Sequence, residues 1–128
     1  MKKKILIVIA NYYKNISSGL LNSAKKELYG RINLIEVPGI FEIPAVISKN
    51  IKKYDGFVAL GCVIKGETPH FEFISKSAID GIMKLSIESK KPIGNGIITC
   101  LNMKQAQARK KKGKEAALAV LSVLNHNK

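Results

Sequence analysis

Hydrophobic residues along the chain alternate between short continuous aliphatic runs and longer stretches with helical spacing. Continuous runs of this kind are typical of parallel strands that are buried on both faces. They occur at residues 5–10, 33–37, 57–64 and 93–99. Each run is followed by a segment in which apolar residues recur every three to four positions. Four strands, each followed by a helix, predict an α/β fold with a parallel sheet covered on both faces.

Residues that favour helix ends divide the helical segments. We expect Ser17 or Ser18 to cap the first helix and Gly30 to end it. The second helix is predicted from Glu42 to about Lys52, and the third begins at Pro69. The chain is helical again from about residue 102, with an apolar stripe at Ala116, Ala117, Val120, Leu121 and Leu124. With no repeat or linker, residues 1–128 are predicted to form one domain, of which about 125–128 are a frayed tail.

Composition excludes several classes of protein. The 128 residues are 46% hydrophobic and 24% charged, which excludes a wholly disordered chain. No apolar run approaches the roughly 20 residues of a membrane-spanning helix. The basic start followed by an apolar run imitates a signal peptide, but the run is short and no small-residue cleavage site follows. Two cysteines, Cys62 and Cys100, are too few for a disulfide scaffold, and a cytoplasmic location is expected.

The formal net charge of +13 raises the alternative of a nucleic-acid-binding module. However, the only arginines among the 22 basic residues are Arg31 and Arg109, whereas proteins that bind phosphates and base edges usually favour arginine. The lysines are also spread over the whole chain, and the densest internal run is Lys110–Lys112. We therefore expect the charge to be mostly solvated surface, with no nucleic-acid partner.

Known cofactor and metal motifs do not explain the chain. Neither Gly-x-Gly-x-x-Gly nor Gly-x-x-x-x-Gly-Lys-Ser/Thr occurs. His70-Phe-Glu72 resembles the His-x-Glu of zinc deaminases, but the required Pro-Cys-x-x-Cys is missing. A nucleophilic pair of Cys62 and His70 is conceivable, although both cysteines are better interpreted as small apolar residues near strand ends. No metal site and no cofactor are predicted.

Two loops at the expected strand ends carry candidate chemistry. Between a strand and a helix, Gly66 and Thr68 could hold an anion on free backbone N–H groups. His70 is expected to project from the first helical turn towards the strand ends, where an imidazole suits proton transfer at neutral pH. In the other loop, Phe41 could pack on a flat ring while Glu42 accepts from a ring N–H or hydroxyl. The alternatives are a surface histidine and an ordinary strand–turn–helix connection.

These segments match a known enzyme family in order and approximate spacing. The matching stretches are Ala10–Tyr13, Val37–Pro44, Ala59–Glu72, Lys91–Thr99 and Lys112–Ala117. The chain thereby resembles the 6,7-dimethyl-8-ribityllumazine synthase family of riboflavin biosynthesis. The resemblance implies a flavodoxin-like three-layer α/β/α sandwich around a four-stranded parallel sheet. It also implies a transferase that needs no cofactor and condenses 5-amino-6-(D-ribitylamino)uracil with 3,4-dihydroxy-2-butanone 4-phosphate.

The resemblance also implies roles for individual residues. His70 would donate and accept protons. The pyrimidine would be bound by Tyr12, Ile40, Phe41, Glu42 and Asn95, and by backbone groups of Cys62, Val63 and Ile64. The butanone phosphate would be bound by Glu67, Thr68 and Arg109, with support from Lys112 and with Glu115 orienting Arg109.

The chain departs from the family at two of these places. Asn95 stands where an aromatic residue of a neighbouring subunit often stacks on the substrate. The segment between Arg109 and Gly113 is several residues shorter than usual, which predicts that Arg109 lies within a continuous helix. Because the family builds its sites between subunits, a homopentamer is expected, and a larger icosahedral shell is left open. A functional link to riboflavin synthase is expected. A non-catalytic flavin or lumazine carrier and an archaeal-type riboflavin synthase are the nearest alternatives.

Overall fold

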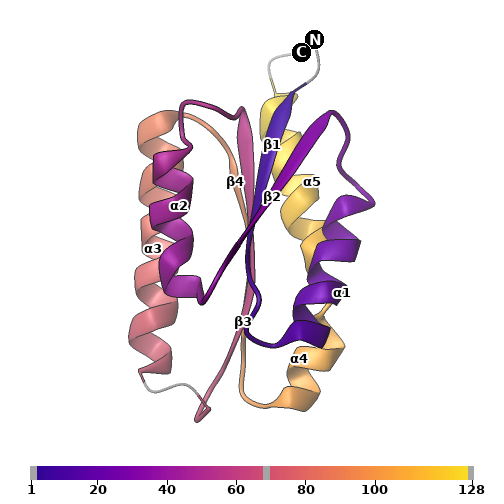
Figure 1. The fold of residues 1–128 in the computed structure, drawn as a ribbon, viewed down its shortest axis with the longest axis vertical. Coiled ribbons are helices and arrows are strands. Elements are labelled where there is room, and N and C mark those ends of the chain that lie inside the picture. Colours follow the sequence, from indigo (N-terminus) through magenta and orange to yellow (C-terminus); the bar gives the residue numbers. More distant parts are fainter. Residues whose placement is uncertain (1–2, 68–69, 127–128) are drawn as a thin grey trace.

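Four parallel strands form one sheet in the computed structural model, which describes residues 3–67 and 70–126. Strands β1 (Lys4–Ala10) and β3 (Gly56–Ile64) lie in the middle of the sheet. Strands β2 (Arg31–Val37) and β4 (Ile93–Cys100) form its two edges, giving the order β2-β1-β3-β4 (Figure 1). The strands predicted from the aliphatic runs are confirmed, with each end within two residues of its predicted position.

Helices cover both faces of the sheet. One layer contains α1 (Lys14–Lys25), α4 (Met103–Arg109) and α5 (Gly113–Leu124) (Figure 1). The other contains α2 (Ile43–Lys49), which continues a short 3₁₀ helix η1 (Ile40–Glu42), and α3 (Phe71–Ser89). The predicted three-layer sandwich is confirmed. Covering both faces is what the continuous aliphatic strands require, because each strand sends apolar side chains to both sides.

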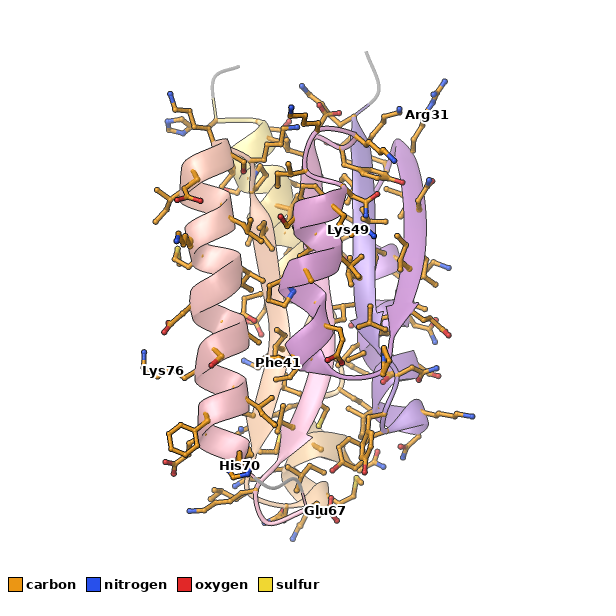
Figure 2. All side chains as sticks on the ribbon, turned by 60° about the vertical axis from the view of Figure 1, so that its left-hand side comes forward. Arg31, Phe41, Lys49, Glu67, His70 and Lys76 are labelled. Carbon is orange, nitrogen blue, oxygen red and sulfur yellow. The ribbon has the colours of Figure 1, made fainter. Side chains whose placement is uncertain are left out.

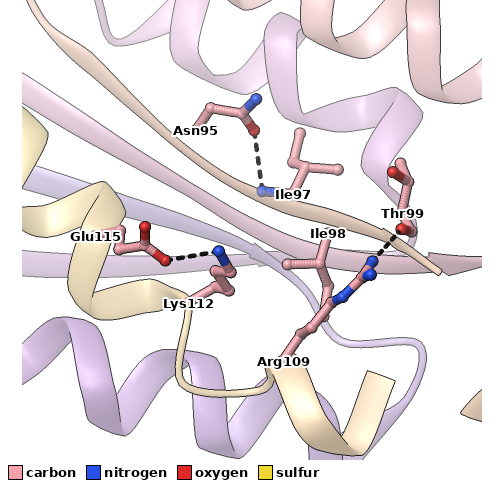
Figure 3. A pocket seen from close by; sticks show the side chains of 7 residues that line it. All are labelled: Asn95, Ile97, Ile98, Thr99, Arg109, Lys112 and Glu115. Carbon is pink, nitrogen blue, oxygen red and sulfur yellow. Dashed lines mark hydrogen bonds and ion pairs between the residues drawn. The ribbon is translucent and has the colours of Figure 1, made fainter. Parts of the chain in front are cut away.

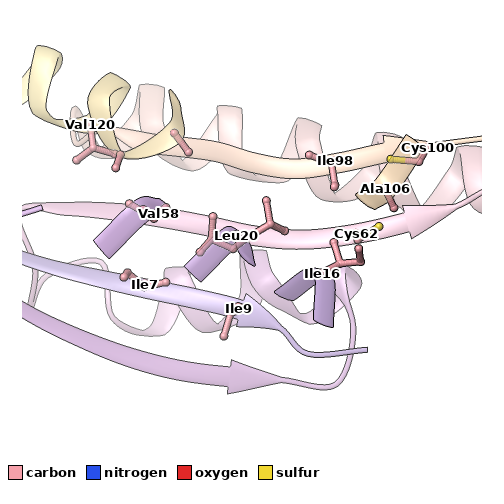
Figure 4. Close-up of a cluster of buried hydrophobic side chains, with 14 of the residues drawn as sticks. Ile7, Ile9, Ile16, Leu20, Val58, Cys62, Ile98, Cys100, Ala106 and Val120 are labelled. Carbon is pink, nitrogen blue, oxygen red and sulfur yellow. The ribbon is translucent and has the colours of Figure 1, made fainter. Parts of the chain in front are cut away.

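The hydrophobic core consists of two layers separated by the sheet. Along β1, Ile5, Ile7 and Ile9 face α1 and α5, whereas Leu6 and Val8 face α2 and α3. Leu20 of α1 and Val120 of α5 complete the first layer (Figure 4). All nine residues of β3 are buried, so this strand is the centre of the molecule. Its buried carboxyl end is the platform on which the loops of the candidate site are built.

The first helix begins and ends earlier than predicted. It begins at Lys14, and Tyr13 occupies the cap position, so the prediction that Ser17 or Ser18 caps it is wrong. The buried Ser17 hydroxyl instead donates a hydrogen bond of 3.1 Å to the carbonyl oxygen of Ala10. The helix ends at Lys25, before Gly30. With a φ of 102°, Gly30 turns the chain into β2, where a side chain would collide with the Lys3 backbone oxygen.

The C-terminal segment forms two helices rather than one. Arg109 is the last residue of α4, and a turn at residues 110–112 leads into α5, so the prediction of a continuous helix through Arg109 is wrong. The turn lets Gly113 approach the backbone carbonyl of Leu20 on α1 so closely that no side chain would fit there. Residues 125–126 still bond to the last turn of α5, whereas the rest of the predicted frayed tail lies outside the described residues.

Candidate active site

The loops that follow β1, β2 and β3 meet at the carboxyl edge of the sheet, as expected for this fold. They enclose a hollow of about 360 Å³, which we call the aromatic pocket. Its lining includes seven residues predicted for the site: Tyr12, Ile40, Phe41, Glu42, Cys62, Val63 and Glu67. The three loops are far apart in the sequence, so the fold itself assembles this group.

Two aromatic side chains at the aromatic pocket remain largely open to solvent. Tyr12 is 66% exposed and Phe41 is 60% exposed. Large aromatic rings left open beside a concave surface are typical of a site that binds a flat ligand. Within the residues that the structure describes, no hydrogen bond or ion pair reaches the Glu42 carboxylate. That carboxylate is available to accept from ring N–H or hydroxyl groups.

A contact that the sequence did not reveal ties two of the loops together. The Tyr13 hydroxyl donates a hydrogen bond of 2.9 Å to Glu67 Oε2, although the two residues are 54 positions apart. The Tyr13 ring also packs edge-on against Tyr12, with 4.9 Å between ring centroids. Tyr13 therefore positions both Tyr12 and Glu67. No sequence signal distinguished it, because two adjacent tyrosines give no indication of which one points into the pocket.

The two cysteines are buried and free, as expected for small apolar residues near strand ends. Burial, followed by the neighbouring Cys100 thiol and the Glu67 carboxylate, raises the pKa of Cys62 to about 12. A thiol must ionise to act as a nucleophile. Cys62 is thus a poor nucleophile. It lies in the wall of the aromatic pocket, whereas His70 lines a different hollow. This geometry does not support a nucleophilic Cys62–His70 pair.

Ile64, expected to present backbone groups to the pyrimidine, is a buried residue at the end of β3. Its side chain is 2% exposed and belongs to the core layer under α1 and α5. Its carbonyl oxygen accepts a 3.3 Å hydrogen bond from the Glu67 backbone N–H. In this structure Ile64 shapes the turn that carries Glu67.

His70 is the residue just before α3 rather than part of its first turn, which corrects the expected position. Its backbone is left-handed, with φ 63° and ψ 32°, and its carbonyl oxygen accepts a hydrogen bond from the Ile74 N–H. Non-glycine residues adopt this conformation at an energetic cost, often at functional sites. Figure 2 shows His70 and Glu67 at the same end of the molecule. Thr68, predicted to bind phosphate, and the predicted helix start at Pro69 lie outside the described residues.

The His70 ring is exposed beside the shallow hollow formed with Lys65, Phe71, Glu72 and Phe73. It lies 6.2 Å from the Phe73 ring, centroid to centroid, and Phe73 is itself 74% exposed. The imidazole is therefore accessible to a ligand at the strand ends. An apolar ring beside it provides a surface against which a ligand or another protein chain could pack.

The remaining predicted residues gather in a second hollow of about 390 Å³, the arginine pocket (Figure 3). Arg109 Nη1 donates a 3.1 Å hydrogen bond to the Thr99 carbonyl oxygen. The Lys112 ammonium group pairs with Glu115 Oε2 at 2.9 Å. Glu115 is thus bonded to Lys112, whereas it was predicted to orient Arg109. In the structure the Thr99 carbonyl oxygen orients the guanidinium group.

The arginine pocket lies around the outer edge of β4. Asn95, Ile97 and Thr99 come from the strand itself, whereas Arg109 and Lys112 come from α4 and the turn after it. Asn95 Oδ1 accepts a 3.0 Å hydrogen bond from the Ile97 backbone N–H, which fixes its amide. Two cationic groups and one carboxylate line this hollow, so it favours an anionic ligand.

The aromatic and arginine pockets have no lining residue in common. The first lies at the ends of the inner strands, and the second lies at a free edge of the sheet. Within one chain, the residues predicted for a single site are therefore divided among three hollows, one of which holds His70. Such a division is expected if a complete site needs two copies of the chain.

Residues 3–67 and 70–126 show neither of two other features. No group of three or more histidine, cysteine, aspartate or glutamate side chains is placed to hold a metal ion in this part of the chain. None of the helices formed by the same residues is both long and apolar enough to cross a membrane.

The fold and the strand-end pocket define the class: a doubly wound α/β protein with an aromatic-lined pocket at the carboxyl edge of its sheet. Comparison with known proteins adds the family. The model of the family described as 6,7-dimethyl-8-ribityllumazine synthase matches residues 2–128. The chain belongs to this enzyme family of riboflavin biosynthesis, which confirms the resemblance stated from its motifs.

Individual relatives agree with the family match. The 6,7-dimethyl-8-ribityllumazine synthase of Bartonella henselae is 44% identical, over 96% of this chain and 87% of the relative. The enzyme of the same name from Agrobacterium fabrum is 41% identical, over 99% of this chain and 96% of the relative. The chain therefore spans nearly the whole length of these relatives.

Proposed function

We propose that the protein condenses 5-amino-6-(D-ribitylamino)uracil with 3,4-dihydroxy-2-butanone 4-phosphate to give 6,7-dimethyl-8-ribityllumazine, inorganic phosphate and water. Membership of the family supports the proposal, and the aromatic pocket is the observation that carries it. Tyr12 and Phe41 offer open aromatic faces to a pyrimidine, and the Glu42 carboxylate can accept from its N–H or hydroxyl groups. Burying a flat ring between such faces adds about 0.5–1.5 kcal/mol per aromatic contact beyond the area term.

The proposed chemistry is a sequence of proton transfers without a cofactor. The substrate amine attacks the ketone carbonyl, and loss of water gives an imine. Loss of phosphate follows, and a second attack by nitrogen on carbonyl closes the ring with loss of water. Each step moves a proton to or from nitrogen or oxygen, which is the work of an imidazole near neutral pH. We assign this role to His70, whose ring is exposed at the strand ends.

The phosphate of the second substrate is assigned to Arg109, with Lys112 nearby, and to the Glu67 loop; Thr68, also predicted to bind it, lies outside the described residues. The hydrogen bond from Arg109 to the Thr99 carbonyl leaves further guanidinium N–H groups to bind phosphate oxygens. The Lys112–Glu115 pair keeps a second ammonium group at the same hollow. These residues are the natural anchor for an anionic group that the reaction releases.

Because the aromatic and arginine pockets are separate in one chain, we propose that one subunit supplies Tyr12, Phe41 and His70 while its neighbour supplies Asn95 and Arg109. A homopentamer is the smallest assembly we propose. Outward-facing apolar side chains on α3, including Met83 at 59% and Ile87 at 68% exposure, support burial between subunits. Sedimentation that shows only monomer under assay conditions would contradict this arrangement. The larger shell, the cytoplasmic location and the link to riboflavin synthase remain predictions.

The experiment that tests the function follows lumazine absorbance when the protein meets both substrates, with the uncatalysed condensation subtracted. His70→Ala should lower kcat about 100-fold or more, as expected for loss of a general acid–base group. Its affinity for the pyrimidine, measured by calorimetry, should stay within about twofold, because the aromatic pocket does not include His70. An unchanged kcat would refute the role of His70, and no turnover by the unmodified protein would refute the function.

A further inference from the structure

A further concave surface lies on the other side of the α4–α5 turn from the arginine pocket. It has a volume of about 420 Å³ and is formed between α1 and the turn. We call it the lysine groove, because its lining includes Lys26, Lys110, Lys111 and Lys114. None of its residues belongs to the aromatic or the arginine pocket. The proposed function therefore leaves it without a role.

The charges of the lysine groove are poorly compensated. Glu27 is the acidic residue in the lining, against four lysines. Across the described ranges, the ion pairs found are Lys76–Asp80 and Lys112–Glu115, so none of the four groove lysines has a carboxylate partner. Like charges held around one hollow repel each other, and an anion that enters the hollow removes this repulsion.

One of the four lysines is held in place by its surroundings. The Lys110 stem lies across α1 at Gly19, where an added Cβ would stand only 2.9 Å from Lys110 Cγ. Lys110 is half-buried there, unlike the exposed Lys26, Lys111 and Lys114. Glycine at position 19 lowers the stability of α1, but its lack of a side chain leaves room for the Lys110 stem to cross the helix. The groove is shaped by packing and is not merely a patch of solvated lysines.

We propose that the lysine groove binds a compact polyphosphate anion. Lysine ammonium groups act as point charges for phosphate, with no demand for the forked geometry that arginine provides. A concave hollow of this volume matches small ligands, whereas an extended nucleic acid would need a long basic surface. The exposed Asn22 amide, which also lines the hollow, supplies neutral N–H donors for phosphate oxygens.

Calorimetric titration with inorganic tripolyphosphate tests the proposal. Lys111→Gln together with Lys114→Gln should weaken binding about tenfold, since two exposed charge contacts are each worth about 0.7 kcal/mol. The matched control is Lys52→Gln with Lys53→Gln, which removes the same charge from an exposed segment after α2. This control should change the affinity by less than about twofold. Equal losses in the two double variants would overturn the proposal, because they would indicate a response to net charge alone.

Two further variants separate the groove from its neighbours. Gly19→Ala keeps the net charge and favours the helix, but it displaces the Lys110 stem, so tripolyphosphate binding should fall about threefold or more. Arg109→Gln changes the arginine pocket only, so it removes the tripolyphosphate binding that this pocket contributes, and binding at the lysine groove should persist. If Arg109→Gln abolished binding while the groove variants did not, the anion site would be the arginine pocket and the proposal would be wrong. Tighter binding of single-stranded RNA than of tripolyphosphate would likewise overturn it.

Discussion

The aromatic pocket and the arginine pocket are built on different parts of the same sheet. The aromatic pocket lies where the buried inner strands end, and its loops are joined by the Tyr13–Glu67 hydrogen bond. The arginine pocket lies around the free edge of β4 and depends on a turn between two helices. One chain thus completes the pocket that we propose binds the pyrimidine ring, whereas it presents outward the pocket that we propose binds the phosphate. The predictions below test this division.

The largest expected effect is restored activity when two defective chains are mixed. His70→Ala subunits carry an intact arginine pocket, and Arg109→Ala subunits carry an intact His70. If a site takes one half from each of two neighbours, random co-assembly at equal amounts leaves about a quarter of the sites with both residues intact. Co-expressed variants should therefore recover about a quarter of the activity, measured at butanone phosphate concentrations where each variant alone is nearly inactive.

The matched control is a mixture of His70→Ala with the Arg109→Ala, His70→Ala double variant, which contains no intact His70. It should recover nothing. If the first mixture also recovers nothing although native mass spectrometry shows mixed assemblies, both residues act within one chain, and the proposed division between subunits is wrong.

Arg109→Ala alone should raise KM for the butanone phosphate about 10- to 100-fold, because a charge-assisted contact to phosphate is lost. The KM for the pyrimidine should stay within about twofold, since the aromatic pocket contains no residue of α4. Steady-state kinetics with each substrate varied in turn provide the measurement. An equal rise for both substrates would indicate that Arg109 supports the fold instead.

The contrast between the two pockets also explains what the sequence could predict. The inner strands were predictable because burial on both faces forces continuous aliphatic runs such as residues 57–64. The loops at their ends follow directly, so Tyr12, Phe41 and Cys62 were correctly expected to lie close to one another. Patterns that are local in the sequence are thus sufficient to predict which loops form the aromatic pocket.

What the sequence could not predict depends on contacts between distant elements. Ser17 has a strong capping tendency, but the close approach of β1 directs its hydroxyl to the Ala10 carbonyl. The break after Arg109 follows from the packing of Gly113 against Leu20, which helical periodicity does not encode. The pairing of Glu115 with Lys112 rather than Arg109 is a consequence of that break. Each of these wrong predictions therefore concerns a packing contact between two elements.

A smaller effect on KM is expected when the hydrogen bond between Tyr13 and Glu67, which joins two loops of the aromatic pocket, is removed. Tyr13→Phe removes the hydroxyl that donates to Glu67 but keeps the ring packed against Tyr12. The KM for the pyrimidine should rise about two- to fivefold, in line with the net worth of one exposed hydrogen bond. Lys112→Gln, which changes only the arginine pocket, should leave this KM unaltered and serves as the control. A Tyr13→Phe enzyme with unchanged kinetics would show that Tyr13 does not position the pocket.

The smallest expected effect concerns the stability of the strand end on which the aromatic pocket rests. Burial raises the pKa of Cys62 from 9.0 to about 12. The folded protein therefore keeps the thiol protonated above pH 9, whereas the unfolded chain loses that proton. The resulting stabilisation is fully present below pH 9 and declines as the pH rises towards 12. The free energy of unfolding should fall in this window by at most about 1.4 kcal/mol per pH unit from this group.

Urea denaturation at several pH values between about 8 and about 10 measures this decline before most lysines titrate. Cys62→Ala should make the decline shallower. Cys100→Ala is the matched control, because it leaves a similar small cavity in the same core layer but keeps the buried Cys62 thiol, so most of the decline should remain. If both variants retained the full slope, Cys62 would ionise in the folded protein as readily as in the unfolded chain. The strand end would then admit more water than its burial indicates, and the aromatic pocket would lose the buried base that distinguishes it from the arginine pocket.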